Sequence, residues 1–123
     1  MDPRAAAPQG GGMHTITRDE LRARIDQGDV VVVEALGPMY FEEGHLPGAI
    51  NIPHTEVAEL APALLPDREA TIVTYCSNTA CGNSHAAAAQ LEAMGYSNVR
   101  TYAEGKQDWR EAGLPLQAGG VPA

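Results

Sequence analysis

Short apolar runs alternate with amphipathic segments along the chain, and this alternation is the main structural signal in the sequence. Apolar or β-branched runs predict five strands, at residues 15–17, 30–33, 49–52, 70–75 and 99–102. Helical spacing predicts five helices between and after them, at residues 17–28, 38–43, 55–65, 84–94 and 106–112. Strands that alternate with helices through short links predict an α/β fold, with a parallel sheet covered on both faces.

The clearest helix boundaries are those of the first helix. Thr17 and Glu20 have the spacing of a capping box, in which each side chain satisfies a backbone N–H at a helix start. Gly28 follows the last apolar position and predicts the C-terminal end. In the helix at residues 55–65, Pro62 predicts a bend or a split.

The two ends of the chain have a different composition. Residues 1–12 and 117–123 consist mostly of small residues, proline and glutamine, which bury too little apolar surface to offset their ordering entropy. We therefore expect one domain at residues 13–116 between a disordered N-terminal tail and a flexible C-terminal tail. Met13 is a second candidate start, so residues 1–12 are either native or a cloning remnant.

Charge and composition exclude several classes of partner. The chain has 123 residues and a net charge of -8, which argues against nucleic acid or an anionic membrane as the main partner. No apolar run approaches the roughly 20 residues of a membrane span, and residues 1–12 lack the pattern of a signal peptide. A cytoplasmic, reducing setting is the expectation. There, two cysteines are more often reactive or metal-bound than joined as a disulfide.

Cys76 stands where chemistry is expected in an α/β fold. It follows the strand predicted at residues 70–75, and ligands of parallel sheets bind at the carboxyl ends of the strands. The loop that follows leads into a helix, and successive N–H groups in such a loop favour an anion and lower a thiol pKa. These residues form the candidate binding loop: Ser77, Asn78, Thr79, Ala80, Cys81, Gly82, Asn83 and Ser84. The alternative is a buried cysteine that merely ends a core strand.

Three motifs in order resemble those of rhodanese domains. The segment at residues 44–53 is similar to that family's Gly-His-Ile-Pro-Gly-Ala motif. The segment from Thr74 to Cys76 and the helix after it resemble its active-site segment. The segment at residues 104–115 is similar to its closing Gly-Gly, Trp and Ala-Gly-Leu-Pro pattern. The resemblance covers residues 15–116.

The resemblance implies both a fold and an activity. The fold is a three-layer α/β domain with a central, mostly parallel, five-stranded sheet flanked by helices. The activity is transfer of sulfane sulfur from a donor such as thiosulfate to a thiol acceptor, through a persulfide on Cys76. It implies no dissociable cofactor and no metal. The expected partners are a small sulfur donor and a thiol acceptor, which includes an acceptor protein.

The sequence departs from the family at two places. Glu34-Ala35-Leu36 stands where the family usually has Asp-Val-Arg, so the arginine is missing. The cysteine loop is two residues longer than usual and contains no arginine or lysine. Loss of a charge-assisted contact of roughly 1.5–3 kcal/mol weakens donor binding by about one to two orders of magnitude. The absence of an arginine near Gly82 also argues against a phosphatase.

Several residues around Cys76 have more than one candidate role. Cys81 is a resolving thiol, a small packed loop residue, or a metal ligand together with Cys76 and His85. His45 more often orients its turn than acts in catalysis, and we expect Glu34 to be its partner. His85, in the first turn of the next helix, is expected near the substrate.

Two other classes of function stay open at this stage. One is an inactive rhodanese-like binding module, which a loop without arginine permits. The other is a thiol redox sensor that uses a Cys76–Cys81 disulfide.

Overall fold

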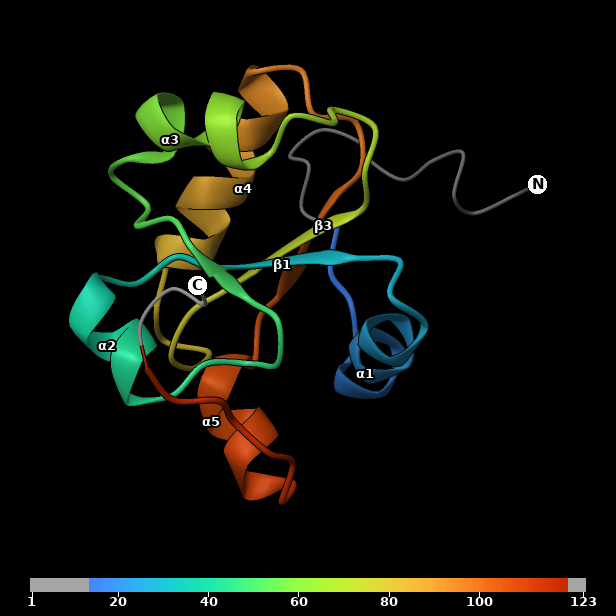
Figure 1. Ribbon diagram of the computed structural model, residues 1–123, viewed down its shortest axis with the longest axis vertical. Coiled ribbons are helices and arrows are strands. Elements are labelled where there is room, and N and C mark those ends of the chain that lie inside the picture. Colours follow the sequence, from blue (N-terminus) through green and yellow to red (C-terminus); the bar gives the residue numbers. More distant parts are fainter. Residues whose placement is uncertain (1–13, 120–123) are drawn as a thin grey trace.

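Four parallel strands in the order β2-β1-β3-β4 form the central layer of the computed structural model, which describes residues 14–119 (Figure 1). The strands are β1 (Val31–Glu34), β2 (Ile50–Asn51), β3 (Ile72–Tyr75) and β4 (Val99–Tyr102). Both β1 and β3 are central, and almost all of their residues are buried. This agrees with the continuous apolar runs, which are typical of strands covered on both faces.

The first of the five predicted strands, at residues 15–17, is reduced to a single bridge, so the prediction of five strands is wrong. Thr15 pairs in parallel with Thr101, and the Ile16 amide donates to the Thr101 carbonyl over 3.1 Å. The next residue, Thr17, is already the N-cap of a helix, and its hydroxyl accepts from the Glu20 amide. The chain therefore turns away from the sheet before a ladder can form.

Helices cover both faces of the sheet and complete the three layers. They are α1 (Arg18–Gln27), α2 (Pro38–Glu43), α3 (Val57–Leu64), α4 (Asn83–Ala93) and α5 (Gly105–Glu111). Figure 1 shows α3 and α4 on one side of the strands, with α1 and α5 on the other. Each face has its own buried hydrophobic cluster. Leu91 of α4 belongs to one cluster, and Trp109 of α5 belongs to the other. The three-layer α/β prediction is confirmed.

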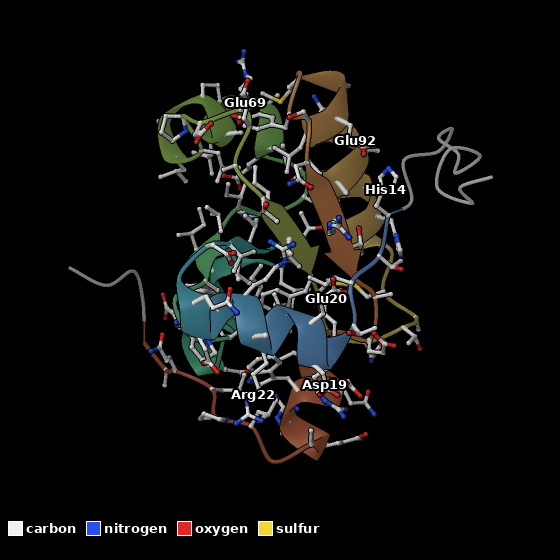
Figure 2. The ribbon with its side chains drawn as sticks, turned by 90° about the vertical axis from the view of Figure 1, so that its right-hand side faces the viewer. His14, Asp19, Glu20, Arg22, Glu69 and Glu92 are labelled. Atoms are coloured by element: carbon white, nitrogen blue, oxygen red, sulfur yellow. A yellow bond between two sulfur atoms is a disulfide. The ribbon has the colours of Figure 1, made fainter. Side chains whose placement is uncertain are left out.

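The helix ends follow the sequence signals closely. Gly28 ends α1 with φ +74°, a conformation that strongly favours glycine. The exposed side of α1 carries Asp19, Glu20 and Arg22 (Figure 2). Pro62 lies inside α3, which runs from Val57 to Leu64 rather than over residues 55–65. No helix in the described part of the chain is long and apolar enough to cross a membrane.

The described chain continues past the predicted boundary at residue 116. Gln117 pairs with His45 in an antiparallel bridge, with both N···O distances at 2.8 Å. Its side chain also accepts from the Gly48 amide. The first residues of the segment predicted to be a flexible tail are thus tied to the turn at residues 44–49, whereas residues 1–12 lie outside the described chain.

Candidate active site

The four strands end in one row, and this row lies next to Cys76. Asn51, Glu34, Tyr75 and Tyr102 are the last residues of β2, β1, β3 and β4, and the register aligns them as neighbours. Cys76 follows Tyr75 directly. Since successive side chains of a strand point to opposite faces, Tyr75 points towards α5 whereas Cys76 lies against the start of α4.

Cys76 is almost completely buried, and its sulfur is bonded to that of Cys81. The residue is 1% exposed, and the two Cα atoms of the disulfide are 6.4 Å apart. The Cys76 Sγ atom also lies 3.4 Å from the Cys81 carbonyl oxygen and 3.8 Å from Ser84 Oγ. This structure therefore holds the loop in its oxidised form, although cysteines in a reducing setting are more often reactive or metal-bound than disulfide-bonded.

A tight turn brings Cys81 back towards Cys76. The Asn78 side-chain oxygen accepts from the Ala80 amide at 3.0 Å, and the Asn78 carbonyl accepts from the Cys81 amide at 3.1 Å. An asparagine that bonds to the backbone two residues ahead forms an Asx turn. In the oxidised form, two of the loop N–H groups expected to face an anion are thus engaged inside the loop.

Backbone amides of helix α5 bind the first residues of the loop. The Lys106 amide donates to the Cys76 carbonyl, and the Gln107 amide donates to the Ser77 carbonyl, each over 2.8 Å. Gly105 allows this approach, because a Cβ atom there would lie 2.6 Å from the Cys76 oxygen and 2.9 Å from the Asn78 nitrogen. Its φ of +70° also favours glycine. The backbone from Cys76 to Asn78 therefore rests on the start of α5.

A buried ion pair anchors α5 to the end of β1. Lys106 Nζ lies 3.0 Å from Glu34 Oε2 and also donates to the Tyr40 carbonyl over 3.0 Å. The Tyr75 hydroxyl donates to Glu34 Oε1 over 2.7 Å and accepts from the Leu46 amide. Burial, and then the Glu34 charge, raise the pKa of Tyr75 above its ordinary value. Glu34 thus has two buried partners on two other elements.

His45 has different partners from the one predicted. Its Nδ1 atom lies 2.8 Å from the Phe41 carbonyl, and its ring stacks on the Phe41 ring with centroids 3.8 Å apart. Glu34 bonds to Tyr75 and Lys106 instead, so the expected Glu34–His45 pairing is wrong. These contacts hold His45 within its turn, as expected for an orienting histidine.

The start of α4 contributes Ser84 and His85. Ser84 is buried, and its carbonyl accepts from the Thr74 hydroxyl over 2.9 Å. This bond ties the start of α4 to β3 just before Cys76. The half-buried His85 has a buried Nδ1 atom without a hydrogen-bond partner. Among residues 14–119, no group of three or more histidine, cysteine or acidic side chains is arranged to hold a metal ion.

A second polar cluster joins α1 to α5 at the end of β4. The Tyr102 hydroxyl donates to Asp108 over 2.6 Å, and Arg18 donates to both oxygens of the same carboxylate. Burial and the bond to Asp108 raise the pKa of Tyr102 above its ordinary value. This cluster fixes α5 from the side opposite Lys106.

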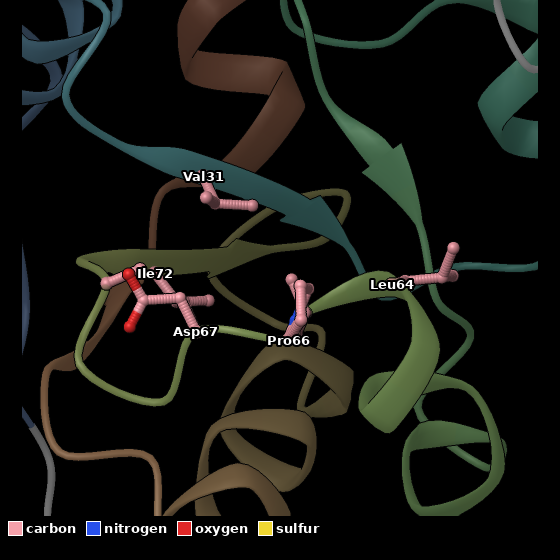
Figure 3. A pocket seen from close by; sticks show the side chains of 7 residues that line it. Val31, Leu64, Pro66, Asp67 and Ile72 are labelled. Atoms are coloured by element: carbon pink, nitrogen blue, oxygen red, sulfur yellow. The ribbon is translucent and has the colours of Figure 1, made fainter.

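Two hollows differ in their relation to Cys76. A polar cleft of about 180 Å³ lies beside the loop. Its lining includes Ser77 and Asn78 from the loop, Lys106 and Arg110 from α5, and the acidic Glu43 at the end of α2. An apolar cavity of about 270 Å³ lies at the opposite, amino-terminal end of the central strands, where Val31 begins β1 and Ile72 begins β3 (Figure 3). Of these two hollows, the polar cleft is the one that adjoins the cysteine loop.

Sequence reasoning missed three supporting residues. Lys106 and Tyr75 were predicted only as helix and strand residues, and Gly105 only as part of a motif. A signal existed for Lys106, because an acidic residue at a buried strand end needs a partner. The sequence alone does not show which of the eight lysines and arginines supplies it.

Comparison with known proteins gives one consistent family. The family model of the rhodanese-like domain matches residues 17–112. The HTH-type transcriptional regulator Rv0324 of Mycobacterium tuberculosis is 36% identical over 115 residues, which cover 94% of this chain and 50% of the regulator. The thiosulfate sulfurtransferase PspE of Escherichia coli is 39% identical over 62 residues, which cover 50% of this chain and 58% of PspE. The chain thus spans about half the length of each of these two relatives.

Solved structures agree with this result. The human single-domain sulfurtransferase TSTD1 is 25% identical and superimposes with a TM-score of 0.71, and the match covers 79% of this chain and 95% of TSTD1.

Proposed function

The chain belongs to the rhodanese-like domain family, and from this premise we propose that it is a sulfurtransferase that carries sulfane sulfur on Cys76. The observation that carries the proposal is the placement of Cys76 at the carboxyl end of β3, held against α5 by its carbonyl and facing the start of α4. The names of the sulfurtransferase relatives support the same class of reaction.

The proposed cycle starts from the dithiol form of the loop. The Cys76 thiolate attacks the outer sulfur of thiosulfate, the S–S bond of the donor breaks, and sulfite leaves with the bonding electrons. Cys76 then carries a persulfide. A thiolate of the acceptor attacks the outer sulfur of this persulfide and removes it, and Cys76 leaves as a thiolate. The chain's part is to hold Cys76 and to stabilise the anionic sulfur by fixed dipoles.

The donor needs positive charge that the cysteine loop itself lacks. Arg110 lines the polar cleft beside Ser77 and Asn78, so the last turn of α5 supplies a cation next to the loop. The Lys106 charge is largely balanced by Glu34, at 3.0 Å. We therefore propose that Arg110 attracts the anionic donor to the mouth of the loop. Its exposure limits the gain to about 1 kcal/mol or less.

A steady-state assay tests the sulfurtransferase proposal. Thiocyanate formation from thiosulfate and cyanide, with the loop kept reduced, is measured for the wild type, Cys76→Ser and Cys81→Ser, and then with an inorganic polysulfide as donor. The proposal predicts that Cys76→Ser abolishes turnover and that Cys81→Ser retains the ability to accept sulfur. A correctly folded wild type that transfers no sulfur from either donor would instead be a binding module.

Two observations favour a second candidate function, a thiol redox sensor. The structure contains the Cys76–Cys81 disulfide. A relative whose match covers 94% of the chain is named a transcriptional regulator. In this alternative a peroxide oxidises the two thiols to the disulfide, and hydrogen peroxide is reduced to water or an alkyl hydroperoxide to an alcohol and water. Thiol counting after peroxide treatment separates the two. A sensor loses both thiols to stoichiometric peroxide and takes up no sulfur from either donor.

A further inference from the structure

We propose that Cys81 is a second nucleophile of the sulfur cycle, which releases the Cys76 persulfide as hydrosulfide and leaves the Cys76–Cys81 disulfide. This inference rests on the proposed function, because it requires a persulfide on Cys76. It adds an outcome beyond transfer, since the chain would reduce sulfane sulfur to sulfide at the expense of a thiol reductant.

The first argument is reach. The disulfide shows that Cys81 Sγ can bond to the sulfur of Cys76 while the sheet and helices are in place. The Asn78 turn, with its bonds to the Ala80 and Cys81 amides, holds the loop in the closed shape that this bond needs. Cys81 therefore acts as an intramolecular thiol with a high effective concentration at Cys76.

The second argument is that the backbone of Cys76 is held by another element of the fold, whereas the bond to the Cys81 amide comes from within the loop itself. The Cys76 and Ser77 carbonyls are bonded to α5 amides, and Gly105 packs directly against this part of the backbone. Thr79, Ala80 and Gly82 are exposed instead, and Cys81 is half-buried among them. Cys76, anchored to α5, is therefore assigned as the residue that bears the sulfur, and Cys81 on the exposed side of the loop as the thiol that attacks it.

The third argument is burial, which selects the direction of each exchange step. Cys76 is 1% exposed in the disulfide, whereas Cys81 is partly accessible. An external thiol therefore reaches Cys81 more readily than Cys76. Attack on Cys81 expels Cys76 as a thiolate, which is the form that the next sulfur donor requires.

The chemistry balances with a dithiol as the named co-reactant. The Cys81 thiolate attacks Cys76 Sγ, the Cys76–Cys81 bond forms, and the bond to the outer sulfur breaks. That sulfur leaves as hydrosulfide with the bonding electrons and its proton, so it is reduced while the two thiols are oxidised. The dithiol then attacks Cys81, Cys76 leaves as a thiolate, and the second thiol of the reductant displaces Cys81 and closes a disulfide in the reductant.

A single-turnover experiment without external thiol tests this step. The reduced chain is freed of reductant under anaerobic conditions and treated with one equivalent of inorganic polysulfide. Small molecules are then removed, and the sulfide that the protein releases and its free thiols are measured over time. The wild type is expected to release about one hydrosulfide per loaded chain and to lose both thiols. Cys81→Ser and Cys81→Ala should instead retain a stable persulfide until a dithiol is added.

The outcomes separate this inference from the proposed function. If wild type and Cys81→Ser both hold the persulfide equally long, with Cys81 a free thiol, the resolving role is overturned while sulfur loading stands. If neither protein takes up sulfur, the proposed function itself has failed. A wild-type disulfide that forms in the absence of polysulfide under the same anaerobic conditions also contradicts the inference, since the oxidant is then not the persulfide.

Discussion

Lys106 and Glu34 form an ion pair 3.0 Å long between α5 and β1, and both side chains are almost fully buried. The amide of the same Lys106 donates to the Cys76 carbonyl. One residue therefore connects the electrostatic anchor of α5 to the backbone of the candidate nucleophile. Changes in this pair are expected to alter both the stability of the fold and the position of the cysteine loop.

Removing one partner of the pair should destabilise the fold strongly. Lys106→Met leaves the Glu34 carboxylate buried without its cation, and such uncompensated charges cost about 3–5 kcal/mol. The double variant Glu34→Gln with Lys106→Met contains no buried charge and should recover a large part of that loss. Urea unfolding of both single variants and the double variant measures this. Additive losses in the double variant would show that the two side chains are not energetically coupled.

Replacement of Gly105 should disturb the loop beyond the effect of backbone strain. Gly105→Ala adds a Cβ atom 2.6 Å from the Cys76 carbonyl oxygen, and it also strains a φ of +70°. Gly113→Ala is the matched control, because its φ is +78° but its Cβ would meet nothing within 4 Å. The control should lose about 1–2 kcal/mol of stability from the strain alone. Gly105→Ala should lose more and should also slow sulfur uptake by Cys76, which the control should not.

The stability of the fold should decrease above about pH 10, the ordinary pKa of tyrosine. Burial and the Glu34 charge raise the pKa of Tyr75, so the unfolded chain loses this proton at a pH where the folded chain keeps it. The unfolded state is then favoured as the pH rises, by about 1.4 kcal/mol per pH unit for this one group. Urea unfolding between about pH 9 and pH 11, on either side of that ordinary pKa, measures the slope. Tyr75→Phe should show a shallower slope, and an unchanged slope would remove Tyr75 as the cause.

The proposed role of Arg110 gives a prediction about the donor. Arg110→Ala removes the exposed cation from the cleft beside the loop, and a contact of up to about 1 kcal/mol corresponds to a rise of about five-fold in KM for thiosulfate. The exposed Arg22 on α1 is the matched control, since it carries the same charge and does not line the cleft. Arg22→Ala should leave KM unchanged. An equal rise in KM for the two variants would show that donor binding responds to the net charge of the chain and not to the position of Arg110.

Local sequence patterns predicted most of the helices and strands. The features that they did not predict depend on contacts between residues far apart in the sequence. The apolar runs that became β1 and β3, and signals such as Gly28, depend on nearby residues and were predicted correctly. The strand predicted at residues 15–17 is only a bridge at Thr15, because Thr17, two residues further on, caps α1. Two local signals therefore competed for the same few residues. Glu34 and Lys106 are 72 positions apart, and no local pattern pairs them. The position of Cys76 followed from strand periodicity, but its disulfide depends on how a polar loop closes.

The measurement that tests the central claim most directly is the intact mass of the reduced Cys81→Ser protein after treatment with thiosulfate or inorganic polysulfide. This variant lacks the thiol that we propose releases the sulfur, so a persulfide on Cys76 should persist. The account predicts one added sulfur atom, which is absent from the variant with Cys76→Ser and lost when a thiol acceptor is added. No mass increase with either donor, or an equal increase in the Cys76→Ser protein, would contradict the claim that Cys76 carries the sulfur.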